Sequence, residues 1–168
     1  AGALFVEVAA TPSIHTPEEA GAYLRSLRQI LRYLDVSDAD LEKGQFRCDA
    51  NVSVRKIGDT KLGTRTELKN LNSFRFVERA IASEIRRQVE VLEGGGKIQQ
   101  QTMHWDDRAG VATPMRTKEQ ADDYRYFPDP DLPPLRVSPA MLERIRASLP
   151  ELPQVRRARY CDELGIPP

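Results

Sequence analysis

Apolar and polar side chains alternate without interruption from Phe46 to Arg55, in the string FRCDANVSVR. Successive side chains of a β-strand point to opposite faces of the sheet, so the alternation predicts a strand that is buried on one face and wet on the other. The apolar face would carry Phe46, Cys48, Ala50, Val52 and Val54, and the polar face Arg47, Asp49, Asn51, Ser53 and Arg55. A strand of this kind belongs to a sheet that packs against a core on one side only.

A second strand is predicted in the string TRTELKN, which follows a loop with glycines at its two ends, residues 58–63. In this string Arg65, Glu67 and Lys69 share one face of the strand. A hairpin that aligned the two polar rows would place two carboxylates, an amide and several cations on one surface. Most alternating strands have simply one solvated face. The mixture of Asp, Asn and Glu with Arg and Lys nevertheless favours a site for a metal ion or a phosphate.

A further strand is predicted at residues 3–10, where the apolar run ALFVEVAA contains a single charge, Glu7. A charge inside an apolar run costs free energy unless it is paired, bound to a metal or in contact with water. Glu7 is therefore a candidate metal ligand, and the alternative is that it points outward. Residues 97–115 are predicted to form another hairpin, in which His104 has no nearby partner and is expected to be structural.

Two long helices are predicted around the central strands. The first begins at a capping box formed by Thr16 and Glu19, and the second runs from about 74 to 93 and ends at three consecutive glycines. A row of arginines on the first helix is expected to be solvated; it consists of Arg25, Arg28 and Arg32. Two short helices are expected beyond Ser138, in the one locally basic region of the chain.

The composition limits the classes of function. Lys and Arg number 25 and Asp and Glu number 25 among 168 residues, so no global field attracts nucleic acid, and any RNA contact would be local. Cys48 is expected to be a buried thiol, and the only other cysteine, Cys161, forms no CxxC motif with it. No apolar run approaches membrane-spanning length. These features suit the cytoplasm or an organellar matrix. The chain opens Ala-Gly-Ala without Met, which suggests a segment of a larger protein.

Three strings carry a family resemblance: RCDANVSVR, GTRTELKNLNSFRFVERAI and DYRYFPDPDLPPL. They resemble the B subunit of the bacterial and organellar aspartyl/glutamyl-tRNA amidotransferases. The resemblance implies an α+β fold, with an antiparallel sheet backed by helices. Residues 1–134 would be part of a glutamine synthetase-like cradle domain, which is the catalytic kinase domain. Residues 135–168 would be the start of a small helical domain.

The resemblance also implies a reaction. The family uses ATP and Mg²⁺ to phosphorylate the side-chain carboxylate of misacylated Glu-tRNA(Gln) or Asp-tRNA(Asn). Ammonia from a partner amidase, the A subunit, then displaces the phosphate, and a small C subunit completes the complex. Phosphoryl transfer depends mainly on positioning and charge neutralisation, so carboxylates that hold Mg²⁺ beside Arg and Lys side chains would serve it.

The predicted site residues fall into three groups. Those expected to be catalytic are Asp49, Glu67, Arg55 and Lys69. Those expected to hold Mg²⁺ are Glu7, Asp49 and Glu67. Those expected to contact ATP or the aminoacyl end are Arg65, Asn51, Arg116 and Arg125.

Two other functions compete with this hypothesis. The sequence lacks the Glu-Ile-His metal strand, the zinc insertion and the tRNA-contacting tail domain of the family, so the fragment alone is expected to be inactive. A non-catalytic tRNA-binding or scaffold module with the same fold is therefore the alternative. An unrelated sheet protein with a wet face would leave the matched strings unexplained.

Overall fold

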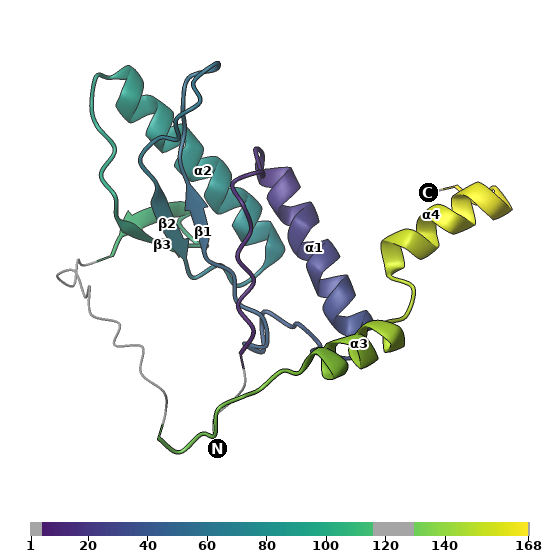
Figure 1. Ribbon diagram of the computed structural model, residues 1–168. Helices are drawn as coiled ribbons and strands as arrows, with labels where there is room; N and C mark the ends of the chain where they lie inside the picture. The colour runs from purple at the N-terminus through teal and green to yellow at the C-terminus, as the bar shows by residue number, and fades with distance from the viewer. Residues whose placement is uncertain (1–4, 116–129, 168) are drawn as a thin grey trace. The chain divides into compact units, whose positions relative to one another are not determined.

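The computed structural model describes residues 5–115 and 130–167 (Figure 1). The chain divides into two compact units, one built from Ala1–Ser26 and Asp40–Met115 and the other from Leu27–Ala39 and Arg116–Pro168. The helices and strands are, in chain order, α1 (Pro17–Tyr33), β1 (Ala50–Val52), β2 (Thr66–Lys69), α2 (Phe74–Glu93), β3 (Thr102–Asp106), β4 (Val111–Pro114), α3 (Pro139–Ser148) and α4 (Pro153–Leu164). No helix in the described ranges is both long enough and apolar enough to cross a membrane.

The four strands form one sheet in the order β1-β2-β3-β4. The β1–β2 and β3–β4 pairs are antiparallel, whereas β2 and β3 are parallel. The parallel pair arises because α2 connects β2 to β3, and the chain travels back along the sheet in the helix before it enters the next strand. The α+β class is confirmed, and the sheet is mixed because the helical crossover sets the direction of β3.

One face of the sheet packs against α2 (Figure 1). The hydrophobic core joins strand residues with both long helices and consists of Ala20, Leu24, Val52, Leu68, Leu71, Val77, Ala80, Met103 and Trp105. Phe46, Cys48 and Ala50 are partly buried against this core, as the alternation predicts. No described helix of this unit covers the opposite face of these strands. The side chains on that face are therefore open to contact with solvent or a ligand.

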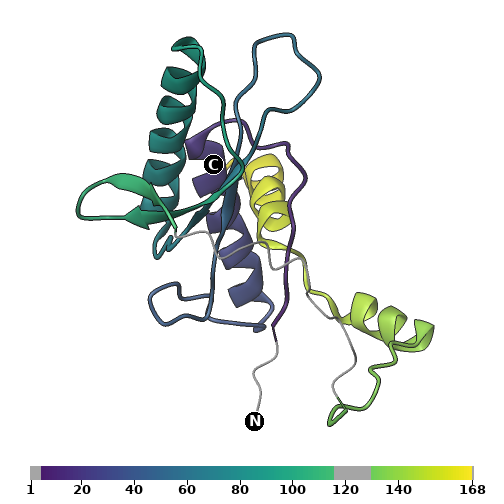
Figure 2. The same cartoon turned by 90° about the vertical axis from the view of Figure 1, so that its left-hand side faces the viewer.

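The first strand is shorter than predicted. Only Ala50–Val52 pairs with β2, and residues 46–49 approach it without regular structure. Beyond Val52, the backbone N–H of Val54 donates to the Gln88 side chain (3.1 Å). The returning loop approaches so closely that a Cβ on Gly63 would collide with the Val54 carbonyl oxygen. Figure 2 shows that the loop between β1 and β2 extends well beyond the strand ends.

The strand predicted at residues 3–10 is wrong for the part that the structure describes. Residues 5–10 have no regular structure, and Phe5, Val6 and Val8 are 88%, 79% and 52% exposed. A strand is stable only when its backbone joins a ladder. Sequence pattern alone does not supply the neighbouring strand.

The helix starts follow their predicted capping chemistry. The Thr16 hydroxyl accepts the N–H of Glu19 (3.1 Å), and the Glu19 carboxylate accepts the N–H of Thr16 (3.3 Å). The Ser73 hydroxyl caps α2 by accepting the N–H of Phe76 (3.1 Å). Each bond satisfies an N–H that has no partner inside the helix.

The arginine row of α1 is solvated as predicted at Arg25 and Arg32, whereas Arg28 is half-buried. Arg25 forms an ion pair with Glu78 of α2 (2.8 Å), and Arg28 donates from Nε to the Ala39 carbonyl (3.1 Å). Arg32 is exposed, as expected. The partners of Arg25 and Arg28 lie outside α1, so helical periodicity does not reveal them.

Candidate functional site

The uncovered face of the sheet carries a continuous polar surface. Val52, Leu68 and Met103 point into the core, so the residues that alternate with them point the other way. We call this surface the polar face; it consists of Asp49, Asn51, Glu67, Lys69, Thr102 and His104. It brings together Asp49 and Asn51 of the first predicted polar row with Glu67 and Lys69 of the second, and β3 adds Thr102 and His104.

Strand register arranges the polar face in rows. Asn51 is paired with Glu67, and Glu67 with Thr102, so these residues are neighbours across three strands. The Thr102 hydroxyl donates to Glu67 Oε2 (2.9 Å). In the next row Lys69 is paired with His104. The aligned rows confirm that the hairpin register places the amide and the carboxylate side by side.

Lys69 lies at the centre of this surface, between the two carboxylates. Its Nζ is 3.5 Å from Glu67 Oε2 and 4.0 Å from Asp49 Oδ2. Arg47 supplies a second cation to Asp49, with NH2 3.3 Å from Oδ2. About a third of each side chain is exposed at Lys69, Glu67 and Asp49 (32%, 34% and 29%). Ion pairs this exposed add roughly 0–1 kcal/mol each to stability, so their main effect is to hold the carboxylates near one another.

Two of the three predicted metal ligands lie on this surface. Glu7 is exposed in the irregular segment at residues 5–10. In the parts of the chain that the structure describes, no three His, Cys, Asp or Glu side chains are grouped so as to hold a metal ion. Asp49 and Glu67 alone still suit Mg²⁺, which usually takes one or two protein carboxylates and keeps several waters.

The remaining predicted residues are dispersed. Arg55 lies in the loop after β1 and donates to the Thr60 carbonyl (3.1 Å). Arg65 is exposed immediately before β2. Arg116 and Arg125 lie outside the described residues. The structure therefore brings together Asp49, Asn51, Glu67 and Lys69.

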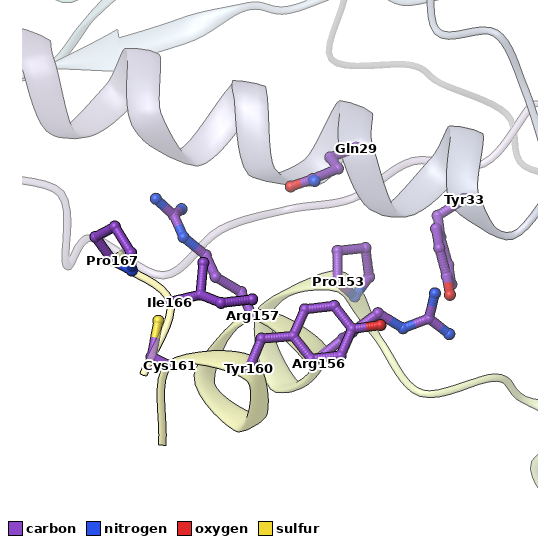
Figure 3. A pocket seen from close by; sticks show the side chains of 9 residues that line it. All are labelled: Gln29, Tyr33, Pro153, Arg156, Arg157, Tyr160, Cys161, Ile166 and Pro167. Carbon is purple, nitrogen blue, oxygen red and sulfur yellow. The ribbon is translucent and has the colours of Figure 1, made fainter. Parts of the chain in front are cut away.

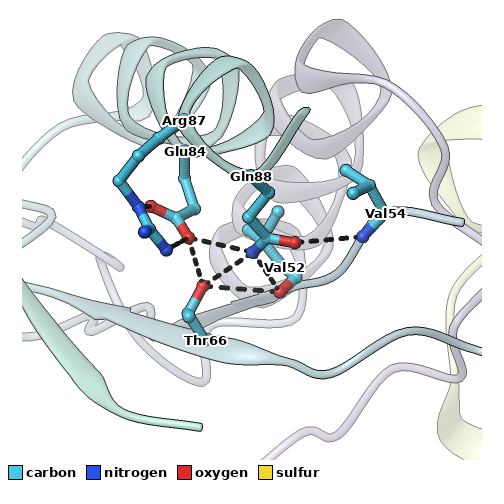
Figure 4. Close-up of polar contacts among 6 residues, drawn as sticks. All are labelled: Val52, Val54, Thr66, Glu84, Arg87 and Gln88. Atoms are coloured by element: carbon cyan, nitrogen blue, oxygen red, sulfur yellow. Dashed lines mark hydrogen bonds and ion pairs between the residues drawn. The ribbon is translucent and has the colours of Figure 1, made fainter. Parts of the chain in front are cut away.

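A buried polar network lies beneath the strands, on the side of α2 (Figure 4). Thr66, Glu84 and Gln88 are at most 1% exposed. Glu84 Oε1 accepts hydrogen bonds from Thr66 Oγ1 (2.6 Å) and Gln88 Nε2 (2.9 Å). Gln88 also donates to the Val52 carbonyl (3.0 Å). The network fastens α2 to β1 and β2, and so supports the strands that carry the acidic part of the polar face.

The sequence did not reveal this network, because hydrophobic periodicity assigns apolar residues to the inner face of a helix. The available signal was spacing: Glu84 and Gln88 follow Val77 and Ala80 at intervals of three or four residues, on the face that α2 turns to the core. Burial acts to raise the pKa of Glu84, but hydrogen bonds from Arg87, Thr66 and Gln88 outweigh it and hold the pKa below its usual range.

The second unit has a hollow of its own, between the end of α1 and α4 (Figure 3). It has a volume of about 290 Å³. The Arg156 guanidinium lies over the Tyr33 ring, 5.4 Å from its centroid, and Nε is 3.4 Å from Glu151. Arg156 thus already contacts Tyr33 and Glu151. The residues that line the hollow do not include any residue of the predicted site.

Comparison with known proteins matches residues 1–143 to the GatB/GatE catalytic domain. The relatives include the B subunit of an aspartyl/glutamyl-tRNA(Asn/Gln) amidotransferase from Moorella thermoacetica, 55% identical over 99% of this chain and 35% of its own length. Another is the protein of the same name from Geotalea daltonii, 56% identical over 96% of this chain and 34% of its own length. A third relative, the protein of the same name from Chlorobaculum tepidum, is 55% identical over 99% of this chain and 35% of its own length. The chain thus spans about a third of the length of these relatives.

Proposed function

The chain belongs to the GatB/GatE catalytic domain family, and on that premise we propose that its polar face performs the phosphorylation step of a tRNA-dependent amidotransferase. The observation that carries the proposal is the arrangement of Asp49 and Glu67 around Lys69 on the uncovered face of the sheet. Carboxylates beside a cation, on neighbouring strands and open to solvent, are suited to holding a metal–nucleotide complex.

The proposed substrates are ATP and the side-chain carboxylate of misacylated Glu-tRNA(Gln) or Asp-tRNA(Asn). A carboxylate oxygen attacks the γ-phosphorus, and ADP leaves with the electrons of the broken bond. Ammonia then attacks the carbonyl carbon of the acyl phosphate; inorganic phosphate departs and a proton is lost, which leaves the amide. The proposed ammonia source is the partner A subunit, an amidase, with a small C subunit in the same complex.

Each side chain of the polar face has a proposed role. Asp49 and Glu67 would hold Mg²⁺, which neutralises the charge that develops on the phosphates during transfer. Lys69 is close enough to both carboxylates to keep them together before the nucleotide binds. Asn51 offers an amide beside Glu67 for orienting the nucleotide.

Four arginines complete the proposal. They would contact phosphate or carboxylate oxygens, for which the planar guanidinium is well shaped; they are Arg55, Arg65, Arg116 and Arg125.

The rival function is a non-catalytic tRNA-binding or scaffold module. Such a module requires no pair of carboxylates sharing one ammonium on a solvent-exposed sheet, so the polar face favours catalysis. The measurement that separates them is ATP cleavage that depends on misacylated tRNA.

The test uses the complete protein, assembled with its partner subunits, carrying Asp49→Asn. This change keeps the side-chain shape and removes one negative charge from the polar face. Removal of one preorganised electrostatic group costs roughly 10²–10³-fold in turnover, and ATP cleavage and amidation should fall together because phosphorylation comes first. Binding of tRNA should persist.

A matched control is Glu90→Gln, which changes an exposed carboxylate on α2. It should leave both activities unchanged. Circular dichroism checks that each variant is folded. Near-normal ATP cleavage by a folded Asp49→Asn protein would overturn the proposal.

A separate expectation concerns the 168-residue chain alone. Because it spans about a third of its relatives, it should not amidate Glu-tRNA(Gln) even with ATP, Mg²⁺ and the partner amidase. Activity at the level of the complete protein would show that the additional parts of the relatives are dispensable.

A further inference from the structure

His104 lies on the polar face, although no sequence pattern assigned it to a site. Met103 and Trp105 on either side of it are 1% exposed and belong to the core, whereas His104 is exposed on the opposite face of β3. It is the register partner of Lys69 on the adjacent strand. Neighbouring strands are about 4.7–4.9 Å apart, so the imidazole stands beside the lysine that joins the two carboxylates.

Asn70 holds this imidazole. It follows β2 directly and has a φ of 67°, a left-handed conformation that Asn tolerates better than most residues. Its Nδ2 lies 2.9 Å from the Trp105 carbonyl oxygen and 3.2 Å from His104 Nε2. Its Oδ1 accepts a hydrogen bond from Asn72 (3.3 Å). The side chain therefore bridges the end of β2 to β3.

These contacts determine which nitrogen of His104 carries the proton. The end of the Asn70 side chain that faces the Trp105 carbonyl must be the NH₂ group, because a carbonyl only accepts. In the same orientation the Asn70 amide oxygen faces Asn72 and accepts from its Nδ2. The NH₂ group also faces His104 Nε2, which must then accept. The proton of neutral His104 is consequently on Nδ1.

We propose that His104 is a substrate-binding residue of the polar face, held by Asn70 as the Nδ1–H tautomer so that this N–H donates to an anionic oxygen of the substrate beside Lys69. The inference rests on the proposed function and assigns it a residue outside the predicted set. Asn70 is the positioning residue, since it acts only through His104.

The charged groups nearest to His104 have contacts of their own. Lys69 is already engaged with Glu67 and Asp49. Asp106, the next residue on the same face of β3, accepts the N–H groups of Arg108 (2.9 Å) and Ala109 (3.0 Å) in its own turn. Both bonds end on Asp106 Oδ1 and hold this carboxylate in its own turn. The proposed acceptor of the Nδ1–H is an oxygen of a phosphoryl group or of the acceptor carboxylate.

The first measurement is the tautomer itself. Nitrogen-15 spectra of the chain, which contains only two histidines, should show Nδ1 protonated in His104; a His104→Asn spectrum assigns the signals. Asn70→Gly removes the amide while keeping a residue that accepts the left-handed conformation. In this variant the preference for Nδ1–H should be lost. An unchanged tautomer would overturn the role of Asn70.

The second measurement is the affinity of the complete protein for Mg·ATP and, separately, for L-glutamate α-methyl ester, which presents the acceptor carboxylate. His104→Leu should weaken binding of one of these ligands about tenfold, the order expected for loss of a hydrogen bond to a charged group. His104→Asn should retain most of the affinity, because its amide can place an N–H near the position of Nδ1. The ligand that is affected identifies the oxygen.

The outcomes separate this inference from the proposed function. If Asp49→Asn abolishes Mg·ATP binding and the His104 variants bind both ligands normally, the inference fails and the function stands. If Asp49→Asn binds and cleaves ATP normally, the proposed function fails and the inference with it. Equal weakening by His104→Asn and His104→Leu would overturn the assignment of Nδ1 as the donor.

Discussion

The buried carboxylate of Glu84 provides a stringent test of how the helix supports the sheet. Glu84 accepts hydrogen bonds from Thr66 (2.6 Å), from Gln88 (2.9 Å) and twice from Arg87 (2.7 and 2.8 Å). We predict that Glu84→Gln keeps the side-chain volume and the bonds from Thr66 and Gln88. The new amide NH₂ would face the Arg87 Nε–H, so two donors would oppose each other there. Arg87 NH2 would still donate to the remaining oxygen, which no longer carries a charge.

The size of the effect follows from burial. A hydrogen bond to a charged group contributes about 1.5–3 kcal/mol net. The Arg87 side chain is 33% exposed and recovers part of its hydration when the pair is lost. We therefore expect the free energy of unfolding to fall by about 2 kcal/mol at neutral pH. With a urea dependence of about 1–3 kcal/mol per molar, the unfolding midpoint should decrease by about 0.7–2 M.

The difference should depend on pH in a defined direction. Hydrogen bonds hold the pKa of folded Glu84 below its usual range, in spite of burial. A lowered pKa in the folded state means that the carboxylate stabilises the fold fully above the unfolded pKa, about 4.3. This contribution is lost as the pH falls through the lower folded value. The gap between the wild type and Glu84→Gln should thus be widest at neutral pH and narrow below about pH 4.

Urea unfolding followed by fluorescence measures this gap, because Trp105 is the only tryptophan and is 1% exposed in the same unit. Glu90→Gln, an exposed carboxylate on the same helix, is the control and should shift the midpoint little. A loss below about 0.5 kcal/mol for Glu84→Gln, or a loss that is the same at pH 7 and pH 3.5, would refute the reasoning.

Three further predictions concern other parts of the chain. A Cβ on Gly21 would collide with the Glu78 carboxylate, so Gly21→Ala should lower the free energy of unfolding in urea by up to about 1 kcal/mol. In a Glu78→Ala background the same substitution should be neutral or stabilising, because Ala favours helix over Gly. Burial, with a smaller effect of the adjacent carboxylate of Asp49, raises the pKa of Cys48 to about 11. Iodoacetamide at pH 8 should therefore alkylate Cys48 at least about 100-fold more slowly in the native chain than in urea, as followed by mass spectrometry, and equal rates would contradict this. The hydrogen bond from Arg159 is the main cause that lowers the pKa of Glu151 to about 2, so the Glu151 carboxyl carbon should titrate by NMR near that value. The stability that the Glu151 carboxylate contributes should disappear as the pH falls from about 4.5 to 2. A titration midpoint above 4 would exclude the ion pair in solution.

Much of the local structure was readable from the sequence. The predicted limits of α2 agree with Phe74–Glu93, and Thr16 and Glu19 form the capping box that their spacing indicates. The alternation between Phe46 and Val52 correctly assigns inner and outer side chains. These features depend on interactions within a few residues, so a single segment contains the information that determines them.

The polar face was partly readable for the same reason. Alternation assigns Asp49, Asn51, Glu67 and Lys69 to outward positions, and the antiparallel register of β1 and β2 brings them together. The placement of Glu7 was not readable, because an apolar run becomes a strand only beside a partner. Of the arginines predicted for the site, Arg55 lies in the loop after β1 and Arg65 is exposed just before β2, while Arg116 and Arg125 lie outside the described residues.

The sequence by itself determined the helix starts, the inner and outer faces of the strands and the family resemblance, since each is written in neighbouring residues or in long matched strings. The tertiary structure alone decided that β3 lies parallel to β2, that Glu84 and Gln88 are buried beneath the sheet, and that Asn70 meets His104. These features depend on contacts between residues at least 18 positions apart, the separation of Thr66 and Glu84. Which distant groups become neighbours depends on how the whole chain packs, and no local pattern encodes it.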